Sequence, residues 1–97
     1  MQLEITVIEQ TPKGRCGCSL AIARDSLMSA FNQRDMVEFS LSACRKSIDL
    51  MKRNEGITET GPREIYYGIT GTFVYHLTKT DDPVSEIVEF AKREFEK

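Results

Sequence analysis

A run of strict two-residue alternation between positions 65 and 77 constrains the fold more than any other feature. One strand of that length would be unusual in a chain of 97 residues. A hairpin with the three-residue loop Thr70-Gly71-Thr72 preserves the alternation and keeps one apolar face toward the core. The predicted cross-strand pairs are Ile69 with Phe73, Tyr67 with Tyr75, and Ile65 with Leu77.

The N-terminal segment predicts a second hairpin. Residues 3–7 alternate apolar with polar side chains, Thr11-Pro12-Lys13-Gly14 is a turn signal, and residues 15–23 alternate again. The second strand turns one face toward the core, made of Cys16, Cys18, Leu20 and Ile22. Its other face carries only small side chains, so we expect a helix to pack closely there; these are Gly17, Ser19, Ala21 and Ala23.

Residues 25–54 between the hairpins predict one long helix or two. Asp25 or Ser26 can cap a first segment, whose apolar residues are Leu27, Met28, Ala30 and Phe31. Asp35 with Glu38 fits a capping box that restarts the helix. The following apolar stripe at helical spacing is Val37, Leu41, Cys44, Ile48 and Met51, and Gly56 can end the helix. Residues 37–41 also alternate as a strand would, but the longer helical stripe favours a helix.

The last segment has the clearest helix signals. Asp82 is a capping residue and Pro83 suits the first helical position. The predicted buried stripe is Val84, Ile87, Val88, Ala91 and Phe95, with Phe90 at its margin. The element order is then ββα(α)ββα. It predicts a two-layer α+β sandwich, in which a four-stranded, mostly antiparallel sheet has helices packed on one face.

Length and composition restrict the class of protein. The 97 residues predict one α+β domain covering 1–97. We expect no membrane segment because no apolar run reaches about 18 residues. The first residues lack a basic stretch followed by an apolar one, so we expect a cytoplasmic protein with reduced thiols. A net charge of −2 gives no general attraction to nucleic acid.

The segment Arg15-Cys16-Gly17-Cys18 raises the question of a metal or redox site. The chain holds three cysteines and one histidine, enough in number for a Cys₃His zinc site. However, one residue separates Cys16 from Cys18, which is narrower than the usual ligand spacing, and Cys44 falls on the helical core stripe. We therefore expect the cysteines to be buried packing residues, with no metal, no cofactor and no catalytic residue.

The functional hypothesis is a small non-enzymatic intracellular module that binds a protein partner or itself, with a homodimer expected. An accessory or inhibitory protein of a mobile element is one such role. The expected contact surface is a sheet edge or the outer face of the second hairpin, with Tyr66, Val74 and His76.

The alternative is a nucleic-acid-binding regulatory domain, which is not favoured because the chain as a whole is acidic. Its expected contact residues are on one basic helix: Arg45, Lys46, Lys52 and Arg53. A small-molecule binder or small enzyme is the third hypothesis.

Overall fold

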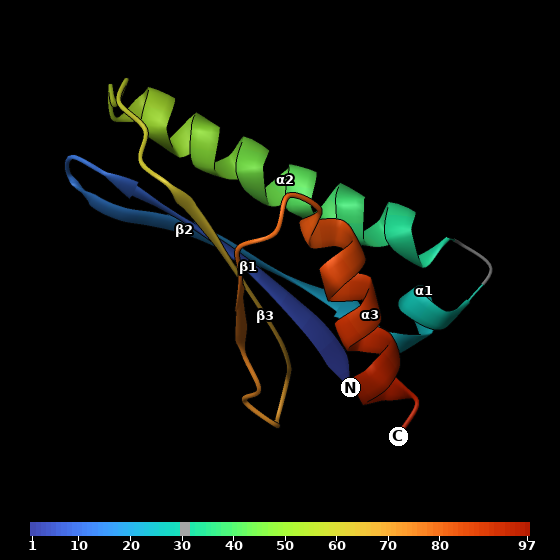
Figure 1. The fold of residues 1–97 in the computed structure, drawn as a ribbon. Helices are drawn as coiled ribbons and strands as arrows, with labels where there is room; N and C mark the ends of the chain where they lie inside the picture. Colours follow the sequence, from blue (N-terminus) through green and yellow to red (C-terminus); the bar gives the residue numbers. More distant parts are fainter. Residues whose placement is uncertain (30–31) are drawn as a thin grey trace.

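In the computed structural model, the chain folds into a four-stranded antiparallel sheet with helices on one face (Figure 1). The structure describes residues 1–29 and 32–97. The strand order is β2-β1-β3-β4. The elements are β1 (Gln2–Thr11), β2 (Gly14–Ala23), α1 (Arg24–Met28), α2 (Gln33–Asn54), β3 (Arg63–Ile69), β4 (His76–Thr78) and α3 (Pro83–Phe95). The predicted fold class and element order are confirmed.

Strand β1 occupies the interior of the sheet and is paired on both sides. It meets β2 without interruption from Gln2↔Ala23 to Thr11↔Gly14, and it meets β3 from Leu3↔Ile69 to Glu9↔Arg63. The β1–β2 turn contains only Pro12 and Lys13, and Gly14 follows with a φ of +125°, which a side chain would disfavour. The first predicted hairpin is therefore confirmed.

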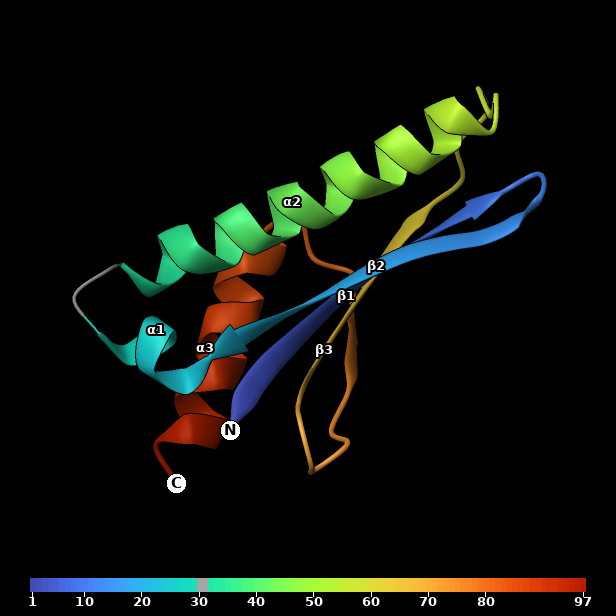
Figure 2. The same cartoon turned by 180° about the vertical axis from the view of Figure 1, so that it is seen from behind.

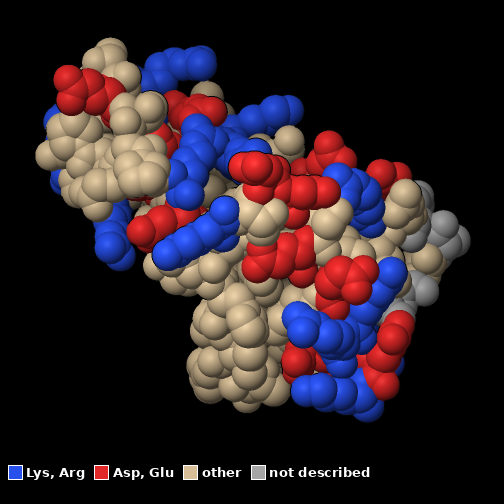
Figure 3. Space-filling view, in the orientation of Figure 1, with Lys and Arg blue, Asp and Glu red and all other residues tan. Residues whose placement is uncertain are grey.

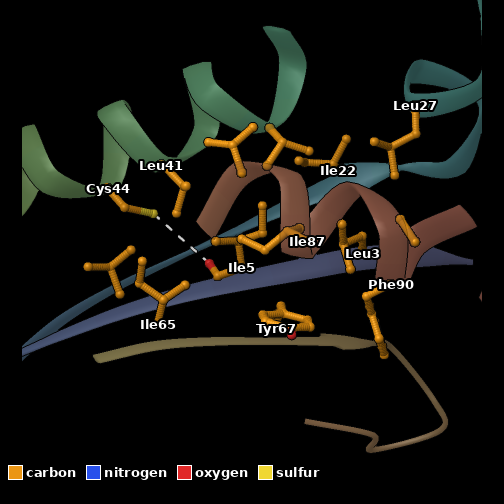
Figure 4. Close-up of a cluster of buried hydrophobic side chains, with 14 of the residues drawn as sticks. Leu3, Ile5, Ile22, Leu27, Leu41, Cys44, Ile65, Tyr67, Ile87 and Phe90 are labelled. Carbon is orange, nitrogen blue, oxygen red and sulfur yellow. Dashed lines mark hydrogen bonds between the residues drawn. The ribbon is translucent and has the colours of Figure 1, made fainter. Parts of the chain in front are cut away.

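Helices α2 and α3 bury one face of this sheet (Figure 4). The predicted α2 stripe is confirmed at Val37, Leu41, Cys44 and Ile48, all buried. Met51 was expected to continue it but is partly exposed, and the next residue, Lys52, is buried instead. In α3, Phe90 is fully buried rather than marginal, whereas Val88 is only partly buried.

The opposite face of the sheet is not covered by the described helices (Figure 2). The prediction of a helix against the small residues of β2 is therefore wrong: Gly17, Ser19, Ala21 and Ala23 are exposed. The physical reason is that both long helices pack on the side of the larger apolar residues, where burial is worth more. Among the described helices, none is long and apolar enough to span a membrane.

The helix starts differ in part from the predicted ones. Asn32 caps α2 by accepting a hydrogen bond from the Arg34 backbone N–H at 3.0 Å, so the box predicted at Asp35 and Glu38 is wrong. Helix α1 begins after Ala23 without a side-chain cap, so the predicted caps Asp25 and Ser26 are both wrong. The prediction for Asp82 and Pro83 in α3 is confirmed.

The described residues between 24 and 54 thus form the two helices α1 and α2, and residues 37–41 lie within α2 rather than in a strand. The predicted core positions Ala30, Phe31 and the side chain of Met28 lie outside the described residues. Leu27, in the same predicted segment, is buried as expected.

The register of the β3–β4 hairpin is one residue away from the predicted one. The structure pairs Ile65 with Thr78, Tyr66 with Leu77, and Tyr67 with His76. The His76 ring stacks on Tyr67, with 5.4 Å between ring centroids, and meets Phe90 of α3 at 5.0 Å. Because side chains alternate between faces, this slip turns the apolar residues of β4 and its loop to the surface.

A pair of truncations distinguishes the two registers. We predict that Leu77→Ala changes the free energy of unfolding by no more than about 0.5 kcal/mol, because Leu77 is exposed. Ile65→Ala, on the buried side of β3, should cost about 2–5 kcal/mol. Urea unfolding of both variants measures this difference, and equal losses would restore the predicted pairing of Ile65 with Leu77.

Candidate interaction surfaces

The β3–β4 hairpin presents an exposed apolar surface, which we call the hairpin patch. It consists of Tyr66, Phe73, Val74, Tyr75 and Leu77. Phe73 is 79% exposed and Leu77 is 41% exposed. Residues 65–78 contain no Asp, Glu, Lys or Arg, although 29% of the whole chain is charged. In Figure 3 the hairpin accordingly forms an uncharged projection below the charged part of the molecule.

Phe73 adopts an unfavourable backbone conformation at the tip of this hairpin. Its φ is +53°, in the left-handed region that a bulky side chain rarely enters. The turn before it is closed by Thr72, whose backbone N–H and hydroxyl both donate to the Ile69 carbonyl, at 3.1 and 2.9 Å. The local geometry therefore holds an aromatic residue in solvent at a cost to stability.

The base of the hairpin is anchored on α3. Tyr67 packs edge-on against Phe90, with ring centroids 4.9 Å apart, and donates its hydroxyl to Glu86 at 2.5 Å. The Thr78 hydroxyl donates to the other oxygen of the same carboxylate. Burial, followed by this hydrogen bond to Glu86, raises the pKa of Tyr67, which keeps the hydroxyl a donor. These contacts therefore fix the base of the hairpin patch against α3.

The structure separates the three predicted contact residues. Tyr66 lies on β3 beside Leu77, and its hydroxyl donates to Glu64 at 3.0 Å. Val74 lies in the loop, where its carbonyl closely approaches Gly68. His76 turns to the helical side of the sheet, against Tyr67 and Phe90, so it does not share a face with Tyr66. The sequence analysis missed Phe73, Tyr75 and Leu77 as surface residues because it assigned them to the core.

The basic residues of α2 do not form one face. The Lys52 ammonium is buried and binds the Glu9 carboxylate at 2.9 Å. Glu9 is 1% exposed, and its second oxygen lies 3.2 Å from Arg63 Nε. Arg63 also reaches Asp49 at 2.7 Å, so a chain of four charges ties β1, α2 and β3 together.

The other three basic residues of α2 differ in exposure. Lys46 and Arg53 are exposed, whereas Arg45 is partly buried, and its Nε has no hydrogen-bond partner in the described part of the chain. A phosphate could reach Lys52 only if the pair with Glu9 were broken. Nucleic-acid binding through the remaining basic residues stays a prediction.

The cysteines do not converge on His76. Cys44 is buried and donates a weak hydrogen bond to the Ile5 carbonyl at 4.0 Å, whereas Cys16 and Cys18 are partly buried at the margin of the core. Burial raises the pKa of the Cys44 thiol to about 12, and a hydrogen bond with Cys18 contributes to the shift. Within residues 1–29 and 32–97, no group of three His, Cys, Asp or Glu side chains is arranged to hold a metal ion.

Comparisons with family models, with curated proteins and with solved structures found no match to this chain.

The buried ion pair between Lys52 and Glu9 allows a test of how the C-terminal end of α2 is attached to the sheet. We predict that Lys52→Met lowers the free energy of unfolding by about 3–5 kcal/mol, because it leaves the Glu9 carboxylate buried without its main partner. The double variant Glu9→Leu/Lys52→Met should recover most of that loss in urea unfolding. If the double variant is as unstable as the sum of both single variants, the two charges are not coupled.

Proposed function

We propose that the chain is a non-enzymatic interaction module that binds a partner protein through the hairpin patch. The observation that carries the proposal is Phe73, an exposed aromatic residue with a φ of +53°. The left-handed conformation costs about 1–2 kcal/mol for a residue with a side chain. Glycine or asparagine would meet the same backbone requirement at lower cost.

The conformational free energy that the left-handed backbone costs at Phe73 is not offset by packing within the described chain, because 79% of the residue is exposed. Strained residues of this kind persist where the surrounding structure enforces them, and they cluster at functional sites. Burial of a phenylalanine side chain in an interface contributes about 1.5–3 kcal/mol. Contact with a partner would therefore offset the local strain.

The chemistry of the patch indicates the class of partner. Two tyrosines and one phenylalanine provide the kind of anchors that dominate protein–protein interfaces. Residues 65–78 contain no lysine or arginine to bind a phosphate, so they favour an uncharged, largely apolar protein surface over a nucleic acid. Tyrosine hydroxyls are the polar side-chain groups of the patch, which supports binding rather than catalysis.

Phe73→Asn tests the proposal because it should separate binding from stability. We predict that its free energy of unfolding is unchanged or up to about 1 kcal/mol higher, since asparagine tolerates the left-handed region. A photoreactive phenylalanine analogue at position 73 should cross-link one defined protein in a lysate of the native host. The same analogue at the exposed position Glu59 is the control.

Excess unlabelled native protein should suppress the cross-link, whereas excess Phe73→Asn protein should not. Identical cross-linked products from positions 73 and 59 would contradict the proposal. A clear loss of stability in Phe73→Asn would also contradict it, because Phe73 would then have a structural role.

A further inference from the structure

We propose that a second copy of the chain docks along the outer edge of β2, so that two sheets join into one of eight strands. The two β2 strands would run antiparallel about a two-fold axis, and the two α2 helices would pack beside each other on the same face. This interface is distinct from the hairpin patch, which lies at the other side of the sheet (Figure 1). The two proposals can therefore fail separately.

The outer edge of β2 has unused backbone groups. The Arg24 N–H donates to the Met1 carbonyl at 3.2 Å, so Arg24 and Met1 form a hydrogen-bonded pair at the end of the β1–β2 ladder. Hydrogen-bonded and non-hydrogen-bonded pairs alternate along an antiparallel ladder. Every second residue of β2 therefore directs its N–H and C=O away from β1: Arg15, Gly17, Ser19, Ala21 and Ala23. No strand of the described chain pairs with this edge.

Natural edge strands usually carry features that prevent pairing with another chain, such as proline, charges, bulges or short length. Strand β2 has ten residues, no proline, one charged residue and an uninterrupted register with β1. The opposite edge strand, β4, has only three residues. Of the two sheet edges, β2 is thus the one suited to pairing with another strand.

Helix α2 presents an uncharged stripe next to this edge. Its members are Met36, Phe39, Ala43, Ser47 and Leu50, and Phe39 is 70% exposed. A hollow of about 230 Å³ separates the start of this stripe from β2, lined by residues 20–23 of β2 and by Ser26, Met36, Phe39 and Ser40. The stripe is symmetric about Ala43, since its other members lie four and seven residues to either side. Two such helices can therefore pack antiparallel with Ala43 at the crossing point.

The midpoints of the strand and of the stripe lie close together. Cys44, at the middle of α2, donates to the Ile5 carbonyl at 4.0 Å, and Ile5 pairs with Leu20, so the middle of α2 lies over the β1–β2 ladder near the middle of β2. One two-fold axis can therefore relate both pairs of elements. Helix α2 contacts both β2 and β1, so it lies about one strand spacing from the proposed axis beside β2. In the joined sheet, the axes of the two α2 helices would therefore be about two strand spacings apart. That is about 9.6 Å, within the 8–10 Å of packed helices.

The charges of α2 also favour an antiparallel pair. Residues 33–43 hold one arginine and two acidic residues, a net −1. Residues 44–54, leaving out Lys52, which is buried in its pair with Glu9, hold three basic residues and one acidic, a net +2. An antiparallel arrangement sets the acidic half of each helix beside the basic half of the other. Asp35 and Arg53 are eighteen residues apart, or five full turns, so they share one flank and can pair between copies. The observations thus favour a second copy over an unrelated protein.

The mass in solution tests the interface. We expect sedimentation equilibrium of the full chain to give twice the chain mass of 11.0 kDa. Phe39→Glu adds a charge to the stripe. Ala21→Pro removes an N–H that points away from β1, so within a single chain it breaks no hydrogen bond of the β1–β2 ladder. Either variant should shift the protein to 11.0 kDa. Ser42→Glu, on the same helix but outside the stripe, should remain a dimer.

The position of the axis has its own test. With Ala43→Cys in a chain whose Cys16 and Cys18 are replaced by alanine, a short bis-maleimide should link two chains, whereas Glu38→Cys in the same background should not link them. Circular dichroism checks that each variant is folded, and Phe39→Glu alone decides the case if Ala21→Pro does not fold.

Three outcomes would overturn the proposal. The first is a mass of 11.0 kDa at the highest attainable concentration. The second is a dimer that survives Phe39→Glu. The third is a dimer that Phe73→Asn dissolves, since the second copy would then occupy the hairpin patch.

Discussion

The structure depends on the burial of β1 beneath a single layer of helices. Leu3, Ile5 and Val7 are fully buried, and β1 is paired with β2 and β3 along most of its length. Because the long helices lie on one face, the other face and both edges of the sheet remain at the surface of the described chain. Helix α2 supports the β2 side of the sheet, and α3 supports the hairpin side. The two candidate interaction surfaces thus lie at opposite edges of one rigid sheet.

The two proposed surfaces differ in chemistry, so each would suit a different kind of partner. The β2 edge offers backbone groups in a regular array, which suit another β-strand. The hairpin patch offers aromatic side chains, with Phe73 held in a left-handed conformation. A dimer joined at β2 would carry one hairpin patch at each end of its eight-stranded sheet. Two linked patches would raise the apparent affinity for any partner that presents two matching sites, without new contacts.

The sequence predicted the fold well because its alternation and helical stripes are strong. It failed in the hairpin register, where the prediction assumed that Phe73, Tyr75 and Leu77 face the core. An aromatic residue at positive φ violates that assumption, and alternation alone does not reveal it. The burial of Lys52 could have been anticipated, since Glu9 continues the inward face of Leu3, Ile5 and Val7 and requires a cation. The uncharged stripe of α2 is also visible in the sequence, but it contains the small residues Ala43 and Ser47, so it is less distinct than the apolar core stripe on the same helix.

Residue-resolved amide hydrogen exchange tests most directly the claim that this protein uses its sheet edge for association. The account predicts slow exchange for the outward amides of Arg15, Gly17, Ser19, Ala21 and Ala23, and loss of that protection on dilution or in Phe39→Glu. The inward amides of Cys18 and Leu20, which belong to the β1–β2 ladder, should stay protected in both cases. Fast exchange of the outward amides in the concentrated native protein, beside protected inward ones, would contradict the account.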